Sequence, residues 1–206
     1  SKEALAANPG NPMLLYFGGL SYMTKDDIEG ARQLLEAALN NSTNENTYLR
    51  SMIYGSLGDL YHKIDMVSAS DVAYEEAIKL DSTNAMAMNN LAYYLSTRKK
   101  DLEKAASYSL RSIELEPNSS TFYDTYAWIL FQQGNYGESL KWMEKALKSA
   151  AQPSAVLVEH YGDILMQLGR SKEALKQWQK ALTIADLSEK DKAKIEEKIK
   201  IKKYVE

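Results

Sequence analysis

The side chains of this 206-residue chain that could do chemistry gather around one histidine. His160 and Asp163 are three residues apart, so they would share one face of a helix, and Glu159 is adjacent to His160. With His62 lying across a groove, these groups could ligate a metal ion or exchange protons with a substrate. Only His160 and Asp163 are reliably close, and a partly buried histidine beside carboxylates is more often an ordinary hydrogen-bonded residue. We therefore expect no catalytic residue, no metal ligand and no cofactor here.

No other catalytic motif is present in the sequence. The chain has no cysteine, which excludes disulfides, thiolate catalysis and cysteine-ligated zinc. It also lacks a phosphate-binding loop, a serine-nucleophile motif and the HExxH pattern of zinc proteases. The sequence therefore predicts a protein that is not an enzyme.

The composition is typical of a helix-rich globular protein. Hydrophobic residues make up 45% of the chain, charged residues make up 26%, and there are only four prolines. The net charge of -3 argues against a nucleic-acid partner, because a nucleic-acid surface needs clustered positive charge. No apolar run approaches the roughly 18 residues that a membrane-spanning helix needs. We expect neither nucleic-acid binding nor a direct membrane span.

The elements that must position these side chains belong to an internal repeat. The segment "YGSLGDLY" has a large-x2-Leu-Gly-x2-Tyr spacing, and a small-x3-aromatic-x2-small spacing follows it. The residues of the two patterns are Tyr54, Leu57, Gly58, Tyr61, Ser70, Tyr74 and Ala77. Together they resemble the tetratricopeptide repeat, a unit of 34 residues that forms a helix, a turn and a second helix.

The same frame fits five consecutive units, each with three positions that hold a small residue. These residues are Gly19, Gly58, Ala92, Ala127 and Gly162 at the first position, Ala31, Ser70, Ala105, Ser139 and Ala174 at the second, and Ala38, Ala77, Ser112, Ala146 and Ala181 at the third. Gly, Ala and Ser make up only roughly a quarter of the chain, so composition does not explain this agreement. Small residues are needed where two antiparallel helices cross closely.

The resemblance implies an all-α fold, a right-handed α-solenoid of antiparallel helix pairs with about five repeats and a C-terminal capping helix. The expected segments are the end of a truncated upstream repeat (1–11), repeat 1 (12–45), an insert (46–50), repeat 2 (51–84), repeat 3 (85–119), repeat 4 (120–154), repeat 5 (155–187) and the capping helix with its tail (188–206). Ala4 and Pro9 would belong to the upstream repeat, whose removal would uncover apolar side chains of repeat 1. We therefore expect self-association through this N-terminal edge.

Two helix starts carry a capping signature. Asn135 and Glu138 are spaced as a capping box for the second helix of repeat 4, and Ser188 with Asp191 has the same spacing before the last helix. Ile195 lies on the face that would pack against repeat 5, so the last helix should shield that repeat and present a polar outer face.

The resemblance also implies a binding surface, because in this family the first helices line a concave groove and certain positions of each unit contact the partner. Transferred to this sequence, those positions give the candidate partner-binding residues Tyr16, Phe17, Leu20, Asp59, His62, Asn89, Asn90, Tyr93, Asp124, Trp128, Phe131, Glu159, His160 and Asp163. Aromatic side chains suit an adaptable apolar groove, and the carboxylates favour a partner of neutral or basic character.

For three of these residues, Tyr93, Trp128 and Phe131, the sequence leaves two interpretations open. Residues 126–131, "YAWILF", make the first helix of repeat 4 apolar almost all round, so both of its faces must be covered. The side chains expected to face the core are Tyr126, Ile129 and Leu130. Trp128 and Phe131 would lean toward the other side, where they either form part of the groove or pack between neighbouring repeats.

The function implied is a non-enzymatic scaffold or adaptor that binds a peptide or helix of a partner protein in the concave groove. An alternative is a regulatory or targeting module of a larger enzyme or regulator whose other domain lies upstream of residue 1. Repeats 3 to 5 are similar to those of bacterial repeat proteins, some of which are attached to the cell envelope. Cytoplasmic and envelope-attached placements both stay open.

Overall fold

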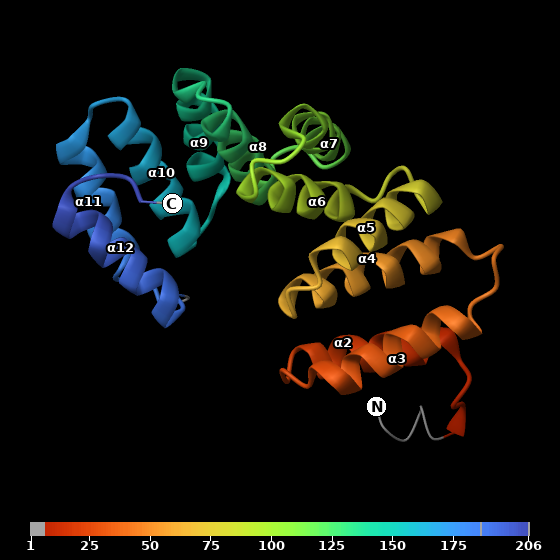
Figure 1. Cartoon of the computed structure of the whole chain (residues 1–206). Coiled ribbons are helices and arrows are strands. Elements are labelled where there is room, and N and C mark those ends of the chain that lie inside the picture. Colours follow the sequence, from red (N-terminus) through yellow and green to blue (C-terminus); the bar gives the residue numbers. More distant parts are fainter. Residues whose placement is uncertain (1–6, 186, 206) are drawn as a thin grey trace. The chain divides into compact units, whose positions relative to one another are not determined.

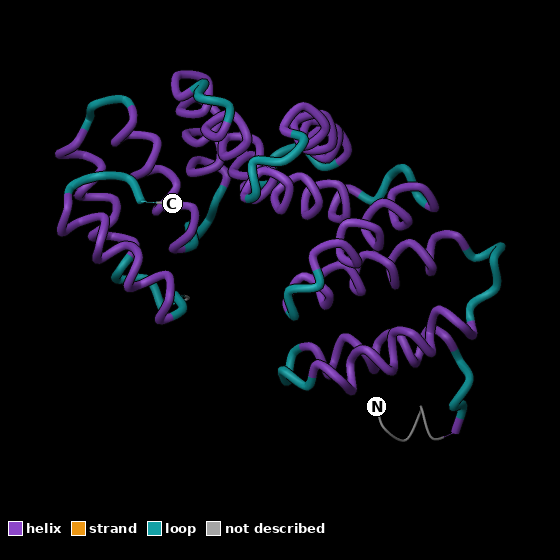
Figure 2. The backbone as a smooth tube through the Cα atoms, in the orientation of Figure 1, coloured by secondary structure: helices purple, strands orange, loops and turns teal. Residues whose placement is uncertain are grey.

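The protein is all-α, as the repeat pattern predicts. The structure is a computed structural model that describes residues 7–185 and 187–205. Within these residues the regular elements are the helices α2 to α12, and none of the residues described forms a strand (Figure 1, Figure 2). None of these helices is long and apolar enough to cross a membrane. The expected position of Ala4 in an upstream repeat lies outside the described residues.

The chain forms two compact units, residues 1–91 and residues 92–206, and the junction between them falls within α6. The first unit contains α2 (Pro12–Met23), α3 (Ile28–Asn41), α4 (Thr47–Lys63), α5 (Val67–Leu80) and the first part of α6 (Ala85–Thr97). The second contains the rest of α6, α7 (Leu102–Leu115), α8 (Ser120–Gln132), α9 (Tyr136–Ser149), α10 (Ala155–Gln167), α11 (Ser171–Ala181) and α12 (Glu189–Ile201).

Consecutive helices pack as antiparallel pairs joined by short turns. The pairs are α2 with α3 and α4 with α5 in the first unit, and α8 with α9 and α10 with α11 in the second (Figure 1). Neighbouring pairs stack on each other through the contacts of α3 with α4 and of α9 with α10. The last helix, α12, packs against α11. These four pairs have the helix-turn-helix form that the sequence predicts.

The fifteen small positions predicted from the repeat are all buried. A Cβ atom on Gly58 would lie only 2.7 Å from the Tyr74 ring, so no larger residue fits at that crossing. The crossings also carry polar links between the paired helices. The hydroxyl of Ser70 donates to the carbonyl oxygen of Gly58 at 2.9 Å, and that of Ser139 donates to the carbonyl oxygen of Ala127 at 2.7 Å.

The turns inside the pairs share one backbone feature, a residue with positive φ directly before the N-cap of the second helix. These residues are Asp26 (φ 62°), Asp65 (φ 59°), Gly134 (φ 78°) and Gly169 (φ 76°). Glycine adopts this left-handed conformation without steric cost, and aspartate is among the few other residues that tolerate it. Each turn reverses the chain within a few residues, which keeps the paired helices close together.

Both predicted capping boxes form N-terminal caps. The Asn135 side chain accepts a hydrogen bond from the Glu138 amide at 3.4 Å, and the Ser188 hydroxyl accepts one from the Asp191 amide at 3.1 Å. The sequence predicts an insert at residues 46–50. In the structure residues 47–50 form the first turn of α4. The physical reason is a cap that the repeat frame did not include: the Asn46 side chain accepts from the Leu49 amide at 3.2 Å.

Candidate functional site

A stack of aromatic rings runs between α8 and α10 in the second unit. The His160 ring lies 4.0 Å from the Trp128 ring at an interplanar angle of 14°, and Trp128 lies 4.7 Å from Phe131 at 7°. Tyr204, in the tail after α12, contacts Phe131 edge-on at 5.2 Å. Trp128 and Phe131 are only 5% and 4% exposed. Trp128 thus packs against His160 of the next repeat, and Phe131 packs against Tyr204 of the tail.

The helix that carries "YAWILF" is covered on both faces, as its all-round apolar character predicts. Ile129 and Leu130 are buried, and Trp128 and Phe131 are buried in a cluster that includes Leu157 of α10 and has Tyr204 of the tail packed against it. Tyr126 was expected to face the core. It is only partly buried, and its ring contacts the Trp142 ring edge-on at a centroid distance of 5.0 Å.

The buried histidine pairs with a carboxylate of the preceding repeat. His160 Nδ1 lies 2.9 Å from Asp124 Oδ1, and both side chains are largely inaccessible. Burial acts against the charged ring, but the charge and hydrogen bond of Asp124, aided by Glu159 and Asp163, outweigh it and raise the pKa of His160. Among the described residues, no three His, Cys, Asp or Glu side chains converge to hold a metal ion. The sequence suggests Asp163 as the neighbour of His160. In the structure the hydrogen-bond partner of His160 is Asp124, on the preceding repeat.

The other carboxylates of α10 bind a lysine that the sequence reasoning did not include. Lys198 of α12 is fully buried, and its Nζ lies 2.5 Å from Glu159 Oε1 and 2.7 Å from Asp163 Oδ2. Asp163 also accepts from the Trp178 indole N–H at 3.0 Å. Burial raises the pKa of Asp163 to about 6, although Lys198 acts to lower it.

Lys198 changes the expected roles of two carboxylates and of the last helix. Glu159 and Asp163, expected to attract a basic partner, are bound by an ammonium group of the same chain. The last helix does cap repeat 5, with Ile195 fully buried, but its inner face is charged as well as apolar. One signal was present in the sequence: Lys198 follows Ile195 by three residues, so both lie on the same helix face.

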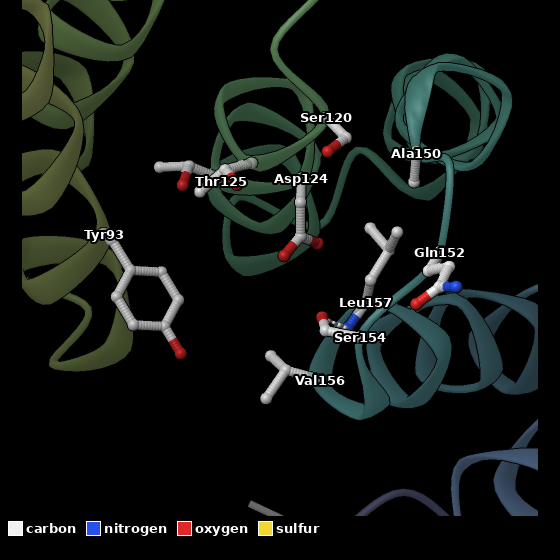
Figure 3. Close-up of a pocket in the computed structure, with 10 residues that line it drawn as sticks. Tyr93, Ser120, Asp124, Thr125, Ala150, Gln152, Ser154, Val156 and Leu157 are labelled. Carbon is white, nitrogen blue, oxygen red and sulfur yellow. Dashed lines mark hydrogen bonds between the residues drawn. The ribbon is translucent and has the colours of Figure 1, made fainter. Parts of the chain in front are cut away.

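An open pocket lies at the N-terminal ends of α8 and α10 (Figure 3). We call it the Asp124 pocket. It has a volume of about 380 Å³ and is lined by Tyr93, Ser120, Thr121, Asp124, Thr125, Ala150, Gln152, Ser154, Val156 and Leu157. The Asp124 carboxylate points into the space between the Tyr93 ring and Val156. Burial, with the nearby charge of Asp124, raises the pKa of Tyr93, so its hydroxyl stays protonated.

A second cavity in this unit lies under the C-terminal tail. It has a volume of about 190 Å³, and its walls include Tyr93, Trp128, His160, Lys194 and Tyr204. The tail reaches this place because Lys202, with φ 54°, ends α12 and reverses the chain. Tyr93 and Val156 line both this cavity and the Asp124 pocket.

The first unit brings another set of candidate residues together. Asp59 accepts hydrogen bonds from the Tyr74 hydroxyl and, at 2.9 Å, from the Asn90 side chain. Burial raises the pKa of Asp59, although both of these hydrogen bonds act to lower it. Asp59 and Asn90 line a cavity of about 160 Å³ whose walls also include Tyr16, Met52 and Met86.

The remaining candidates of the first unit are dispersed. Phe17 is 55% exposed, whereas Leu20 packs against the core and Asn89 is buried with its amide toward Asn90. His62 is partly buried near the end of α4.

Comparison with known proteins gives the family. The model of the tetratricopeptide repeat family matches residues 20–188. A TPR repeat-containing protein of Pseudomonas aeruginosa is 26% identical over 164 residues, which are 78% of this chain and 26% of that protein. The protein ycf37 of Porphyra purpurea is 33% identical over 87 residues, which are 42% of this chain and 50% of that protein. The chain thus spans about a quarter and a half of the lengths of these two relatives.

The fold agrees with solved structures of the same kind. The crystal structure of a thermophilic TPR protein of Thermus thermophilus matches with a TM-score of 0.72 at 16% identity, and the match covers 90% of this chain and 97% of that one. Pseudomonas and Thermus are bacteria, in keeping with the bacterial type of repeat expected from the sequence. At this identity the match shows the α-solenoid fold alone. The family match over residues 20–188, the buried small positions and the stacked helix pairs together place the chain in the tetratricopeptide repeat family.

Proposed function

We propose that this chain is a non-enzymatic scaffold or adaptor whose first helices bind a segment of a partner protein. The observation that carries the proposal is the Asp124 pocket, about 380 Å³ of open space between the starts of two first helices. Such a volume is at the small end of ligand sites and suits one or two side chains of a peptide. Membership of the repeat family supports protein binding in general, because these repeats serve as protein-interaction scaffolds.

The chemistry of the pocket wall favours recognition over catalysis. His160 directs its Nδ1 to Asp124 and its ring face to Trp128, so it supports Asp124 structurally from outside the pocket lining. The wall itself offers hydroxyls, one amide and the aliphatic side chains of Val156 and Leu157. These groups can orient a peptide by hydrogen bonds while apolar contacts exclude water.

The first unit offers a second surface for the same partner or for another one. Its cavity combines the Asp59–Asn90 hydrogen bond with Met52 and Met86, and Met86 is 53% exposed. Methionine side chains adapt their shape to different apolar partners. The candidate residues that lie inside the packing, such as Trp128 and Asp163, would then position the surface without contacting the partner.

The test is affinity capture from a lysate of the source organism, comparing the wild type with a Tyr93→Ala, Val156→Ala double variant of the pocket wall. A matched control carries Tyr48→Ala and Leu110→Ala, two changes at exposed residues of α4 and α7. We expect proteins that the wild type and the control capture and the pocket variant loses. Equal capture by all three forms, with unchanged thermal unfolding, would contradict the placement of the partner at this pocket.

A further inference from the structure

We propose that the Asp124 pocket receives a positively charged side chain, lysine or arginine, from the partner segment. This inference rests on the proposed function and specifies the chemistry of the same site. The charge of the lining residues supports it. Asp124 is the one acidic side chain among the ten residues that line the pocket, and none of the ten is a lysine, arginine or histidine. A cation that enters therefore meets Asp124 with no lysine, arginine or histidine among the lining residues, while His160 holds Asp124 Oδ1 from outside the pocket lining.

The Asp124 carboxylate is largely shielded from water. The Asp124 side chain is 13% exposed, so a charge pair formed there is screened by water less than a surface pair. His160 contacts Oδ1, and a carboxylate has acceptor capacity on both oxygens. Figure 3 shows this group directed into the pocket, where a charge-assisted hydrogen bond can form.

Apolar surface beside Asp124 can hold the aliphatic part of an entering side chain. The Tyr93 ring stands on one side of the carboxylate, and Val156, 37% exposed, stands on the other (Figure 3). Lysine and arginine bury their aliphatic stems along apolar surface while the charged end reaches a polar partner. The hydroxyl of Ser154 lies on the same wall and can accept one of the remaining N–H groups.

The second unit already shows how an ammonium group is bound between these repeats. Lys198 reaches Glu159 and Asp163 from α12, and its Nζ lies 5.8 Å from the Trp178 ring and 5.3 Å from the Tyr204 ring. The combination of carboxylate and aromatic ring recurs in the Asp124 pocket with Asp124 and Tyr93. At the first site the chain supplies the ammonium group from α12, and at the second His160 holds Oδ1 of Asp124 while the pocket beside the carboxylate is open.

The experiment is an NMR titration of the isotope-labelled full chain with four blocked pentapeptides, acetyl-Ala-Ala-Xaa-Ala-Ala-amide. The central residue is lysine, arginine, norleucine or glutamate. We expect the lysine and arginine peptides to shift the amide signals of Tyr93, Asp124 and Val156. Their affinity should exceed that of the norleucine peptide by about tenfold, the factor that one charge-assisted hydrogen bond can supply.

Two variants of an exposed lining residue test the charge without disturbing the core. Thr121→Lys places an ammonium three residues before Asp124 on the same helix face, whereas Thr121→Gln adds comparable bulk without charge. We expect Thr121→Lys to weaken binding of the lysine peptide about fivefold or more, and Thr121→Gln to weaken it less than about twofold. Neither change should lower the melting temperature noticeably.

Three results would overturn the inference: equal affinity for the lysine and norleucine peptides, signal shifts away from the pocket, or no binding by any peptide. If the norleucine or glutamate peptide binds at the pocket and the lysine peptide does not, the inference fails while the proposed function stands. The proposed function fails separately, when affinity capture by the wild type and the pocket variant is the same.

Discussion

His160 and Asp124 form a buried residue pair that is sensitive to pH. The pKa of His160 is higher in the folded chain than in the unfolded chain, mainly because Asp124 outweighs the opposing effect of burial. The charged pair therefore contributes stability that is complete below about pH 6.5, the unfolded value, and is lost as the pH rises through the folded pKa. Glu159 and Asp163 also face this ring and act in the same direction.

We expect the wild type to have a higher melting temperature at about pH 6 than at about pH 8.5. The difference should be clearly smaller in a His160→Gln variant, because glutamine has no charge to lose. Thermal unfolding followed by circular dichroism at both pH values measures it. A pH dependence identical in the two proteins would show that His160 does not carry the effect.

Two buried serines provide a contrast at the same scale. The Ser139 hydroxyl donates to the Ala127 carbonyl, whereas the Ser109 hydroxyl is buried and has no hydrogen-bond partner among the described residues. Ser139→Ala should lower the free energy of unfolding by about 1 kcal/mol, while Ser109→Ala should be neutral or raise it by up to about 1 kcal/mol. Chemical denaturation gives both values. Equal losses in the two variants would contradict this account.

At the scale of the elements, the turn geometry separates two glycines. Gly169 has φ 76° and open space around it, whereas Gly137 lies inside α9 with open space around it. Gly169→Ala should destabilise by about 1 kcal/mol, since alanine is strained in the left-handed region. Gly137→Ala should stabilise by about 0.5 kcal/mol, since alanine favours the helix. Because neither new methyl group meets a neighbour, the opposite signs test the backbone alone. Thermal or chemical unfolding measures both changes, and the same sign for both would contradict the assigned turn.

The last helix is fixed by its buried lysine. Lys198→Ala would leave Glu159 and Asp163 buried without their cation, which typically costs about 3 to 5 kcal/mol. The control is Lys200→Ala, at an exposed position of the same helix, which should change stability by less than about 0.5 kcal/mol. Urea unfolding of the two variants makes the comparison. A loss for Lys198→Ala as small as that of the control would mean that α12 is held by Ile195 and its apolar neighbours alone.

The helices and their crossings were predictable from the sequence because they recur. A small residue at one crossing, such as Gly58, is weak evidence, but the same size limit applies at every pair and so appears fifteen times. The start of α4 was not predictable from the frame, because Asn11, Ser119 and Ser154 cap helices directly before their repeat frames, whereas the Asn46 cap lies further upstream of its frame and adds a turn to α4. The same holds for the site: Tyr93 and Asp124 were found from repeat positions, whereas Lys198 was not, because the capping helix has no equivalent in the other units.

At the scale of the whole molecule, burial divides the candidate residues into two groups. Trp128, Phe131 and Asp163 are buried in the packing of the second unit, so their removal would report on folding and not on binding. Tyr93 and Asp124 line open space in the second unit, and Asp59 and Asn90 line a smaller cavity in the first. Pairing between repeats, as in the contact of Asp124 with His160, depends on the three-dimensional stacking of α8 and α10. No spacing along the sequence contains this information.

The measurement that tests the central claim most directly is site-specific photocrosslinking in the source organism. A benzophenone amino acid replaces Val156, on the rim of the Asp124 pocket, or Leu110, an exposed residue of α7 that serves as the control. The account predicts a defined crosslinked partner protein from position 156 and none from position 110. Crosslinking from position 110 alone, or from neither position, would contradict a protein-binding role for the first-helix surface.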